Sequence, residues 1–258
     1  MTDEEGTQAT ETATATDGFN WRLLLSYAAL GAAAIILFAS VFIFKSADPP
    51  FIVMFLLLFI GAVLARRTGK AGVTGIVLAS LGSLMFVMFG GFFAVTLIET
   101  PEASKDFIPV MSTLVFTLMV VISAIALAIR GEGRGFEPSG ASSALGWIGV
   151  LLVTGLVGWS LYASSQYESV ASEADDVLVV TNDFEFVPKS LNADAGTVAI
   201  HVTNADDALH TFTIDELGVD VSIPSGKTNR VEFEAKEGEY RFYCKPHAPD
   251  MEGKIEIG

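Results

Sequence analysis

The chain has 258 residues, of which 51% are hydrophobic and only 17% are charged, and its formal net charge is −15. This composition is too apolar for an ordinary soluble protein, and a chain of this length is expected to contain more than one part. The acidic charge argues against nucleic acid as a partner, because phosphate binding needs clustered Lys and Arg. The single cysteine, Cys244, cannot form an intramolecular disulfide.

The first segment, residues 1–20, is rich in Thr, Ala and Glu. It has too little apolar surface to fold and is predicted to be a disordered acidic tail. The tail lacks the basic stretch that begins a signal peptide, and the apolar run that follows is longer than a signal-peptide core. We therefore expect that run to remain attached as a membrane span.

Long apolar runs fill the next part of the chain. The predicted spans are 21–44, 51–65, 73–98, 108–129 and 145–162. Such runs are typical of transmembrane helices, because about 20 residues cross a hydrocarbon core of about 30 Å. The second run is short, but Pro49 and Pro50 suit a helix start, and Arg66 and Arg67 can reach the interface at its far end. Residues 21–163 are predicted to form a transmembrane domain of five helices.

The basic residues of the short loops predict the orientation of this domain. One side of the membrane would carry Arg22, Arg66, Arg67, Lys70, Arg130 and Arg134. The other side would carry only Lys45 and Lys105. The basic side is predicted to be cytoplasmic, together with the N-terminus. An odd number of spans then places the C-terminal part outside the cytoplasm.

The membrane part has no histidine, and its apolar runs contain no Asp, Glu or Lys. Haem between transmembrane helices usually takes His ligands, and ion or proton pathways need buried ionisable groups, so we expect neither. Gly75, Ala79 and Ser83 follow a four-residue spacing that lets helices approach closely. We interpret them as helix-packing residues, with docking against another membrane subunit as the alternative.

Residues 164–176 form a polar, acidic, Ser-rich segment that is predicted to be a linker. After it, apolar residues occupy alternate positions, for example at 198–202 and 240–244, which is typical of strands with one buried face. Turn residues such as Asn182-Asp183 and Pro224-Ser225-Gly226 separate several short strands. Residues 177–258 are therefore predicted to be a small all-β sandwich.

Three potential metal ligands lie on one short segment after a predicted strand. Two residues separate Cys244 from His247, and three separate His247 from Met251. A thiolate, an imidazole and a thioether form a soft ligand set, and a second imidazole would complete a trigonal site with a weak axial sulfur. His210, which follows a turn and opens another strand, can supply that imidazole. The spacing predicts one mononuclear copper ion.

The segment GEYRFYCKPH at residues 238–247 resembles the copper loop of plastocyanin, azurin and related blue copper proteins, the cupredoxins. Residues 184–188, and Asn204 ahead of His210, resemble the first half of such domains. The resemblance covers residues 177–258 and implies a Greek-key β-sandwich. It implies a copper plane of His210, Cys244 and His247, with Met251 as the axial ligand.

The sequence departs from that family at two places. The spacing from His247 to Met251 is one residue shorter than in plastocyanin, although azurin-like and CuA-type loops have it, and Pro249 lies within the shortened loop. Thr211 follows the first histidine, where many relatives have Asn. We expect the Thr211 hydroxyl to replace part of the hydrogen bonding near the thiolate.

Other residues of the β part receive structural interpretations. His201 lies between Ile200 and Val202 in an alternating pattern and is predicted to be a surface residue. The aromatic residues are predicted to form the core of the sandwich rather than an electron relay. They are Phe184, Phe186, Phe212, Phe233, Tyr240 and Phe242.

A copper ion without an open coordination position favours one-electron transfer over catalysis. We therefore expect a membrane-anchored type 1 (blue) copper electron carrier that is not an enzyme and has no small-molecule substrate. Its partners would be redox proteins in or on the same membrane. Cationic partner proteins would fit the acidic charge of this chain. Multicopper oxidases and copper nitrite reductases need more than the three histidines present, and a CuA centre needs two cysteines.

Two alternatives remain for the metal. The first is a copper-binding or copper-delivery module that assists a membrane enzyme or copper homeostasis. Delivery favours exposed sites rich in Met and His, but only Met251 among seven methionines is placed as a ligand. The second is zinc, for which a thioether is a poor ligand.

Overall fold

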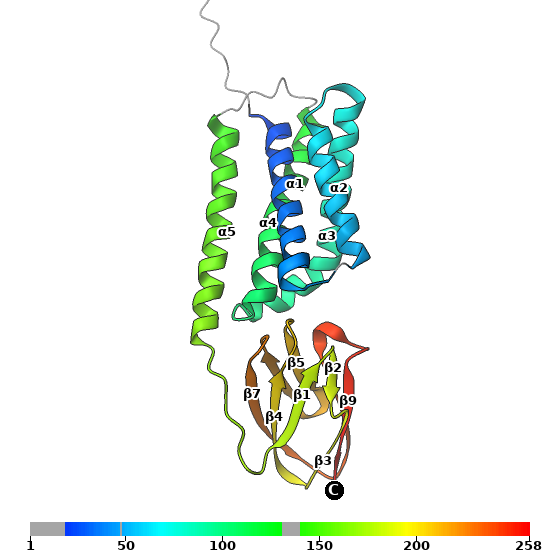
Figure 1. Cartoon of the computed structure of the whole chain (residues 1–258), viewed down its shortest axis with the longest axis vertical. Coiled ribbons are helices and arrows are strands. Elements are labelled where there is room, and N and C mark those ends of the chain that lie inside the picture. The colour runs from blue at the N-terminus through cyan, green and yellow to red at the C-terminus, as the bar shows by residue number, and fades with distance from the viewer. Residues whose placement is uncertain (1–18, 47, 131–139) are drawn as a thin grey trace, which may run out of the picture.

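The computed structural model describes residues 19–46, 48–130 and 140–258. A helical part precedes a smaller β domain along the chain, and the two lie end to end (Figure 1). This arrangement confirms the predicted fold class. Most of the predicted tail, residues 1–18, and the predicted cytoplasmic Arg134 lie outside the described residues.

Each predicted apolar run lies on one helix. The helices are α1 (Trp21–Phe38), continued by a π-helical turn (Ala39–Ile43), α2 (Pro49–Ala65), α3 (Gly69–Glu99), α4 (Ser104–Arg130) and α5 (Gly140–Gln166). Four of these helices are long and apolar enough to cross a membrane, namely α1 with its π turn, α3, α4 and α5. As predicted, α2 is the short one, with 17 residues, and it begins at Pro49.

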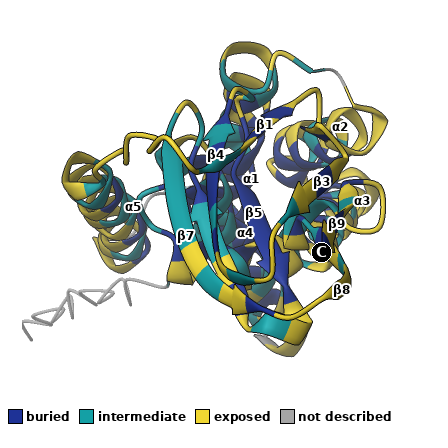
Figure 2. Cartoon of the chain, turned by 90° about the horizontal axis from the view of Figure 1, so that it is seen from below, coloured by how far each residue is buried: buried dark blue, intermediate teal, exposed yellow. Residues whose placement is uncertain are grey.

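Small residues set the spacing between the helices. A methyl group on Gly75 of α3 would lie 2.1 Å from the backbone nitrogen of Ala65 on α2, and one on Gly61 would lie 2.4 Å from that of Ala79. Only glycine allows the two backbones to approach so closely. The outward faces of α2, α3 and α5 are exposed, as their yellow positions show (Figure 2), and many of these exposed residues are large and hydrophobic.

The β domain consists of two packed sheets. Its strands are β1 (Val177–Asn182), β2 (Glu185–Val187), β3 (Ser190–Ala193), β4 (Gly196–Asn204), β5 (His210–Ile214), β6 (Val219–Ile223), β7 (Thr228–Ala235), β8 (Gly238–Tyr243) and β9 (Glu252–Ile257). One sheet has the order β2-β1-β4-β7 and the other β3-β9-β8-β5-β6. The β1–β4 and β3–β9 pairs are parallel, and the remaining pairs are antiparallel.

The core between the sheets contains most of the predicted aromatic residues. Phe186, Phe212 and Phe242 are fully buried, and their ring centroids lie 4.9–6.0 Å apart. Phe233 and Tyr240 pack against this core while partly exposed. The prediction is wrong for Phe184, whose side chain is 49% exposed. Phe184 lies at the end of the sandwich in the turn between β1 and β2, where no second sheet covers it.

His201 also differs from its prediction. It is buried, and its Nε2 atom lies 2.9 Å from the backbone oxygen of Val170. The side chain does point away from the core, as the alternation predicts, but the segment between α5 and β1 covers it. A contact between segments about thirty residues apart is invisible to a local pattern.

The segment that covers His201 is the predicted linker. Helix α5 continues to Gln166, so the connecting segment begins at Tyr167 rather than at Ser164. Hydrogen bonds join this segment to the β domain. The Tyr167 hydroxyl donates to the backbone oxygen of Ser222 at 3.2 Å, and Arg230 Nε donates to Asp176 at 2.9 Å. These bonds hold the segment against the domain.

One end of the β domain faces the helical part (Figure 1). His247 and residues 207–209 of the β4–β5 loop line a cavity together with residues of the helices, so they lie at this end. Leu209 belongs to a buried cluster with Leu97 of α3 and Phe107 of α4. Its backbone N–H donates to Asp106 Oδ2 at 2.9 Å. Two lysines from the helical part, Lys45 and Lys105, pair with Asp207. Apolar and ionic contacts thus join the β domain to the helices.

Candidate metal centre

The segment after β8 folds back on itself. Cys244 directly follows the strand, and the short 3-10 turn Lys245–His247 returns the chain, so that the His247 N–H donates to the Cys244 oxygen at 3.1 Å. The Met251 N–H donates to the His247 oxygen at 3.1 Å, and the Cys244 N–H donates to the Met251 oxygen at 3.0 Å. These bonds bring the ends of the loop together.

Three of the predicted ligands meet at one point. Cys244 Sγ lies 3.3 Å from His247 Nδ1 and 3.6 Å from His210 Nδ1, and the two Nδ1 atoms lie 3.1 Å apart. A thiol and two imidazoles converging in this way are the donor set of a trigonal copper site. The residues present therefore fit a copper ion.

The fourth predicted ligand, Met251, is buried, with 1% of its surface exposed. Its backbone is bonded to both Cys244 and His247, as described above, so the loop fixes its position relative to these residues. Coordination by its sulfur stays a prediction.

Asp206 orients the first histidine, and the sequence analysis did not identify it. His210 Nε2 donates to Asp206 Oδ2 at 2.8 Å, which leaves Nδ1, the nitrogen that lies near Cys244 Sγ, as the nitrogen that a metal would use. The same carboxylate accepts the backbone N–H groups of Asp183 at 2.7 Å and Phe184 at 3.3 Å. The signal in the sequence is an acidic residue four positions before His210, in the turn that precedes the histidine.

Phe184 shields the two imidazoles. Its ring meets those of His247 and His210 edge to face, with centroids 4.8 and 5.5 Å away. The residue adopts a positive φ of 60°, a conformation that few non-glycine residues take, and the bond from its N–H to Asp206 supports it. The residue expected in the core therefore lies beside the metal centre.

Thr211 connects the first histidine to the cysteine loop. Its backbone N–H points at Cys244 Sγ, 3.4 Å away, and its hydroxyl accepts the Lys245 N–H at 2.9 Å. A thiolate accepting a backbone N–H is stabilised, and the hydroxyl fixes the peptide that follows the cysteine. The hydroxyl thus acts in the hydrogen bonding next to the thiolate, as the sequence analysis expects.

Burial sets the charge of the metal-free site. It raises the pKa of Cys244 to about 11, against the opposing effect of the Thr211 and His247 N–H groups. Burial also lowers the pKa of His247 to about 4 and lowers that of His210. At neutral pH the thiol is protonated and both imidazoles are neutral. A bound cation would instead favour the deprotonated Cys244, because it stabilises the thiolate.

Comparison with known proteins agrees with this geometry. The cupredoxin-like domain family matches residues 151–257. The C-terminal part of this chain is a cupredoxin-like domain, preceded by apolar helices. Curated protein sequences give no match.

Several solved structures are similar to the chain. A reduced mutant of amicyanin is 18% identical over 34% of this chain and 86% of its own, with a TM-score of 0.30. A haem-copper terminal oxidase dimer solved by cryo-EM contains a chain that is 16% identical over 46% of this chain and 99% of its own, with a TM-score of 0.30. The periplasmic domain of cytochrome oxidase subunit II from Bradyrhizobium japonicum is 23% identical over 27% of this chain and 54% of its own, with a TM-score of 0.25.

Proposed function

We propose that this chain is a membrane-anchored type 1 copper protein that carries single electrons on the extracytoplasmic face of a membrane. The observation that carries the proposal is the convergence of Cys244 Sγ with two imidazole nitrogens, at 3.3 and 3.6 Å, inside a cupredoxin-like domain. Copper bound there would supply a one-electron couple.

The protein residues would keep the ligand cage constant between the two oxidation states. Asp206 holds His210, the Thr211 hydroxyl holds the peptide after Cys244, and backbone bonds close the loop up to Met251. His210 and Cys244 have no exposed surface, whereas His247 is partly exposed. A rigid, buried cage lowers the reorganisation that accompanies each transfer, and His247 is the route by which electrons enter and leave.

The helices support the membrane anchor and its orientation. Lys45 and Lys105 lie at the end of the helical part that contacts the β domain, where both pair with Asp207. Arg22 lies at the opposite end, where it donates to the backbone oxygen of Arg67 at 2.8 Å. The basic end is cytoplasmic under the positive-inside rule, so the β domain is extracytoplasmic. Redox partners would then lie in or on the same membrane, and the net charge of −15 favours cationic ones.

Visible absorption of the copper-loaded full chain tests the proposal. A Cu(II)–thiolate bond gives an intense band, which should disappear in Cys244→Ser. His201→Gln should keep the band, because His201 lies outside the centre and contacts Val170 instead. A wild-type chain that binds copper without the band would contradict the proposal and favour delivery. Preference for zinc over copper would contradict it too.

A further inference from the structure

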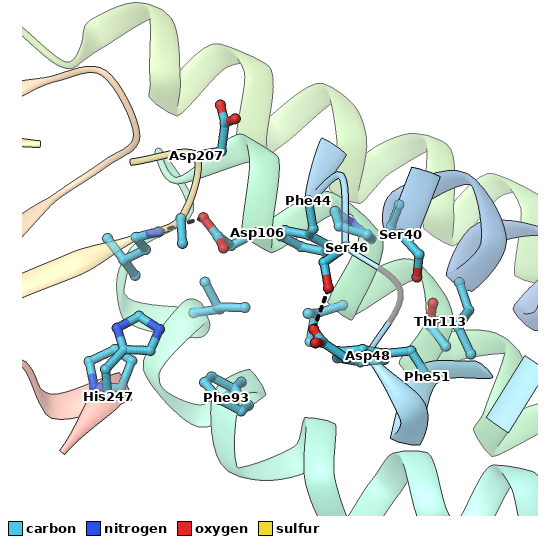
Figure 3. Close-up of a pocket in the computed structure, with 18 of the residues that line it drawn as sticks. Ser40, Phe44, Ser46, Asp48, Phe51, Phe93, Asp106, Thr113, Asp207 and His247 are labelled. Atoms are coloured by element: carbon cyan, nitrogen blue, oxygen red, sulfur yellow. Dashed lines mark hydrogen bonds between the residues drawn. The ribbon is translucent and has the colours of Figure 1, made fainter. Parts of the chain in front are cut away.

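A cavity of about 420 Å³ lies between the helical part and the β domain. Its walls come from the end of α1 with its π turn, the start of α2, the end of α3, the start of α4, and three loops of the β domain, namely the β1–β2, β4–β5 and β8–β9 connections. His247 belongs to its lining, and Figure 3 shows the imidazole at one side of the space. The size is typical of a site for a small organic molecule.

The cavity is mainly apolar with a few polar groups. Aromatic side chains from α2, α3 and the residue after the π turn line it, namely those of Phe44, Phe51, Phe86 and Phe93. Polar side chains occur around it (Figure 3), including Asp106 and the hydrogen-bonded pair Ser46 and Asp48. Asp106 accepts the Leu209 N–H, and a carboxylate can accept further donors. This lining suits a flat aromatic molecule that carries hydroxyl groups.

Two of the aromatic wall residues also reach the outer surface of the helices. Phe51 and Phe93 are each 39% exposed, and their neighbours Ile52 and Phe92 are 45% and 66% exposed. In a membrane these outward faces contact lipid. A molecule dissolved in the bilayer therefore meets the cavity wall without crossing water.

The same arrangement restricts access by a second protein. The loops on either side of His247 contact the helical part: Leu209 packs between α3 and α4, and Asp207 is held by two lysines. The histidine face is thus occupied by the chain's own helices, and a donor to His247 on this side must fit inside the cavity.

We propose that this cavity binds a lipid-soluble hydroquinone, which donates electrons to the metal centre past His247. The inference rests on the proposed function and names the class of electron donor. It replaces the expectation, drawn from the sequence, that the protein has no small-molecule substrate. Oxidation of one hydroquinone to the quinone releases two electrons and two protons. The electrons would leave one at a time, each reducing one Cu(II) to Cu(I), and the redox partner protein of the proposed function would reoxidise the ion between the two transfers. The protons would pass to water.

Binding can be measured without copper. The metal-free full chain in phosphatidylcholine nanodiscs is labelled with a photoactivatable azido derivative of decylubiquinone, a short-tailed benzoquinone, and the labelled peptides are mapped by mass spectrometry. We expect saturable labelling of peptides containing Phe51, Phe93 or His247, displaced by unlabelled decylubiquinol.

Filling the cavity should remove this labelling. Val110→Trp places a large ring in the cavity and should weaken binding by about tenfold or more. Val95→Trp is the matched control, because Val95 is 67% exposed on the outer face of α3. Ser40→Phe fills the cavity from another wall, in case Val110→Trp does not fold. The thermal unfolding of the metal-free variants in the same nanodiscs reports folding.

Three results would overturn the inference: no saturable labelling, equal labelling of the folded cavity-filling variants and Val95→Trp, or displacement by added phospholipid as easily as by the quinol. The last would mean that an acyl chain fills the cavity. These failures can be told apart from failure of the proposed function. The proposed function is tested separately, by the visible band of the copper-loaded wild-type chain.

Discussion

Asp206 illustrates how single residues outside the ligand set govern this site. It accepts three hydrogen bonds, from His210 Nε2 and from the backbone of Asp183 and Phe184, and so joins a ligand to the turn that shields it. Partners of this kind typically contribute one to two powers of ten in metal affinity. The same logic applies to Thr211, whose hydroxyl fixes the peptide after Cys244.

Removing the Asp206 carboxylate should weaken copper binding. In Asp206→Ala, His210 loses the acceptor that fixes its tautomer, and we expect a fall in copper affinity of about 10- to 100-fold, measured by competition with a chelator. Asp194→Ala makes the same charge change at an exposed site in the β3–β4 turn. Equal affinities in the two variants would refute the role of Asp206.

Thr211→Val should destabilise the β domain. The substitution keeps the branched shape but leaves the Lys245 N–H without its acceptor next to a buried sulfur. An unsatisfied buried donor costs about 1–3 kcal/mol, measured as the free energy of unfolding in denaturant. Thr197→Val, on an exposed position of β4, should cost much less. A loss no larger than in this control would show that the bond contributes little.

At the scale of elements, the loop between β4 and β5 connects the two parts of the molecule. Its Asp207 receives hydrogen bonds from Lys105 and Lys45, which hold the pKa of that carboxyl below its usual range. Next to it, Asp106 accepts the Leu209 N–H, and Ser225 accepts a hydrogen bond from Lys105. These contacts place the metal-binding end of the sandwich against the helices.

Docking of the β domain should therefore weaken in acid. Since the pKa of Asp207 is lower in the docked state, the ion pairs stabilise docking above the ordinary carboxyl pKa, and this contribution is lost as pH falls through the lowered value. Distances between spin labels on α5 and β7 should broaden toward longer values at acid pH. Asp207→Asn should be more open at neutral pH and respond less to acid. An identical pH response in wild type and variant would assign the effect to another group.

The helices and the cysteine loop are predictable from the sequence because their signals are local. Apolar runs indicate membrane-spanning helices, and the spacing of Cys244, His247 and Met251 indicates a metal-ligand loop. The positions of His201 and Phe184 were predicted wrongly because strand alternation cannot show what covers a strand or where a sheet ends. The bond between Asp106 and Leu209 joins residues 103 positions apart, so only the tertiary fold reveals it.

At the scale of the whole molecule, the helices contact the β domain and cover the face through which the proposed metal centre would exchange electrons. An electron carrier must keep its metal in both oxidation states, whereas a delivery protein must release it. The buried cage and the covered histidine face argue for retention.

Redox cycling of the copper-loaded full chain, with the metal counted at each stage, tests this account most directly. Reduction followed by reoxidation should remove and restore the visible band through a single one-electron step. The copper content should stay at one ion per chain, even with a copper-free acceptor protein present. Transfer of the ion to that acceptor on reduction, faster than reoxidation restores the band, would contradict electron transfer and establish copper delivery.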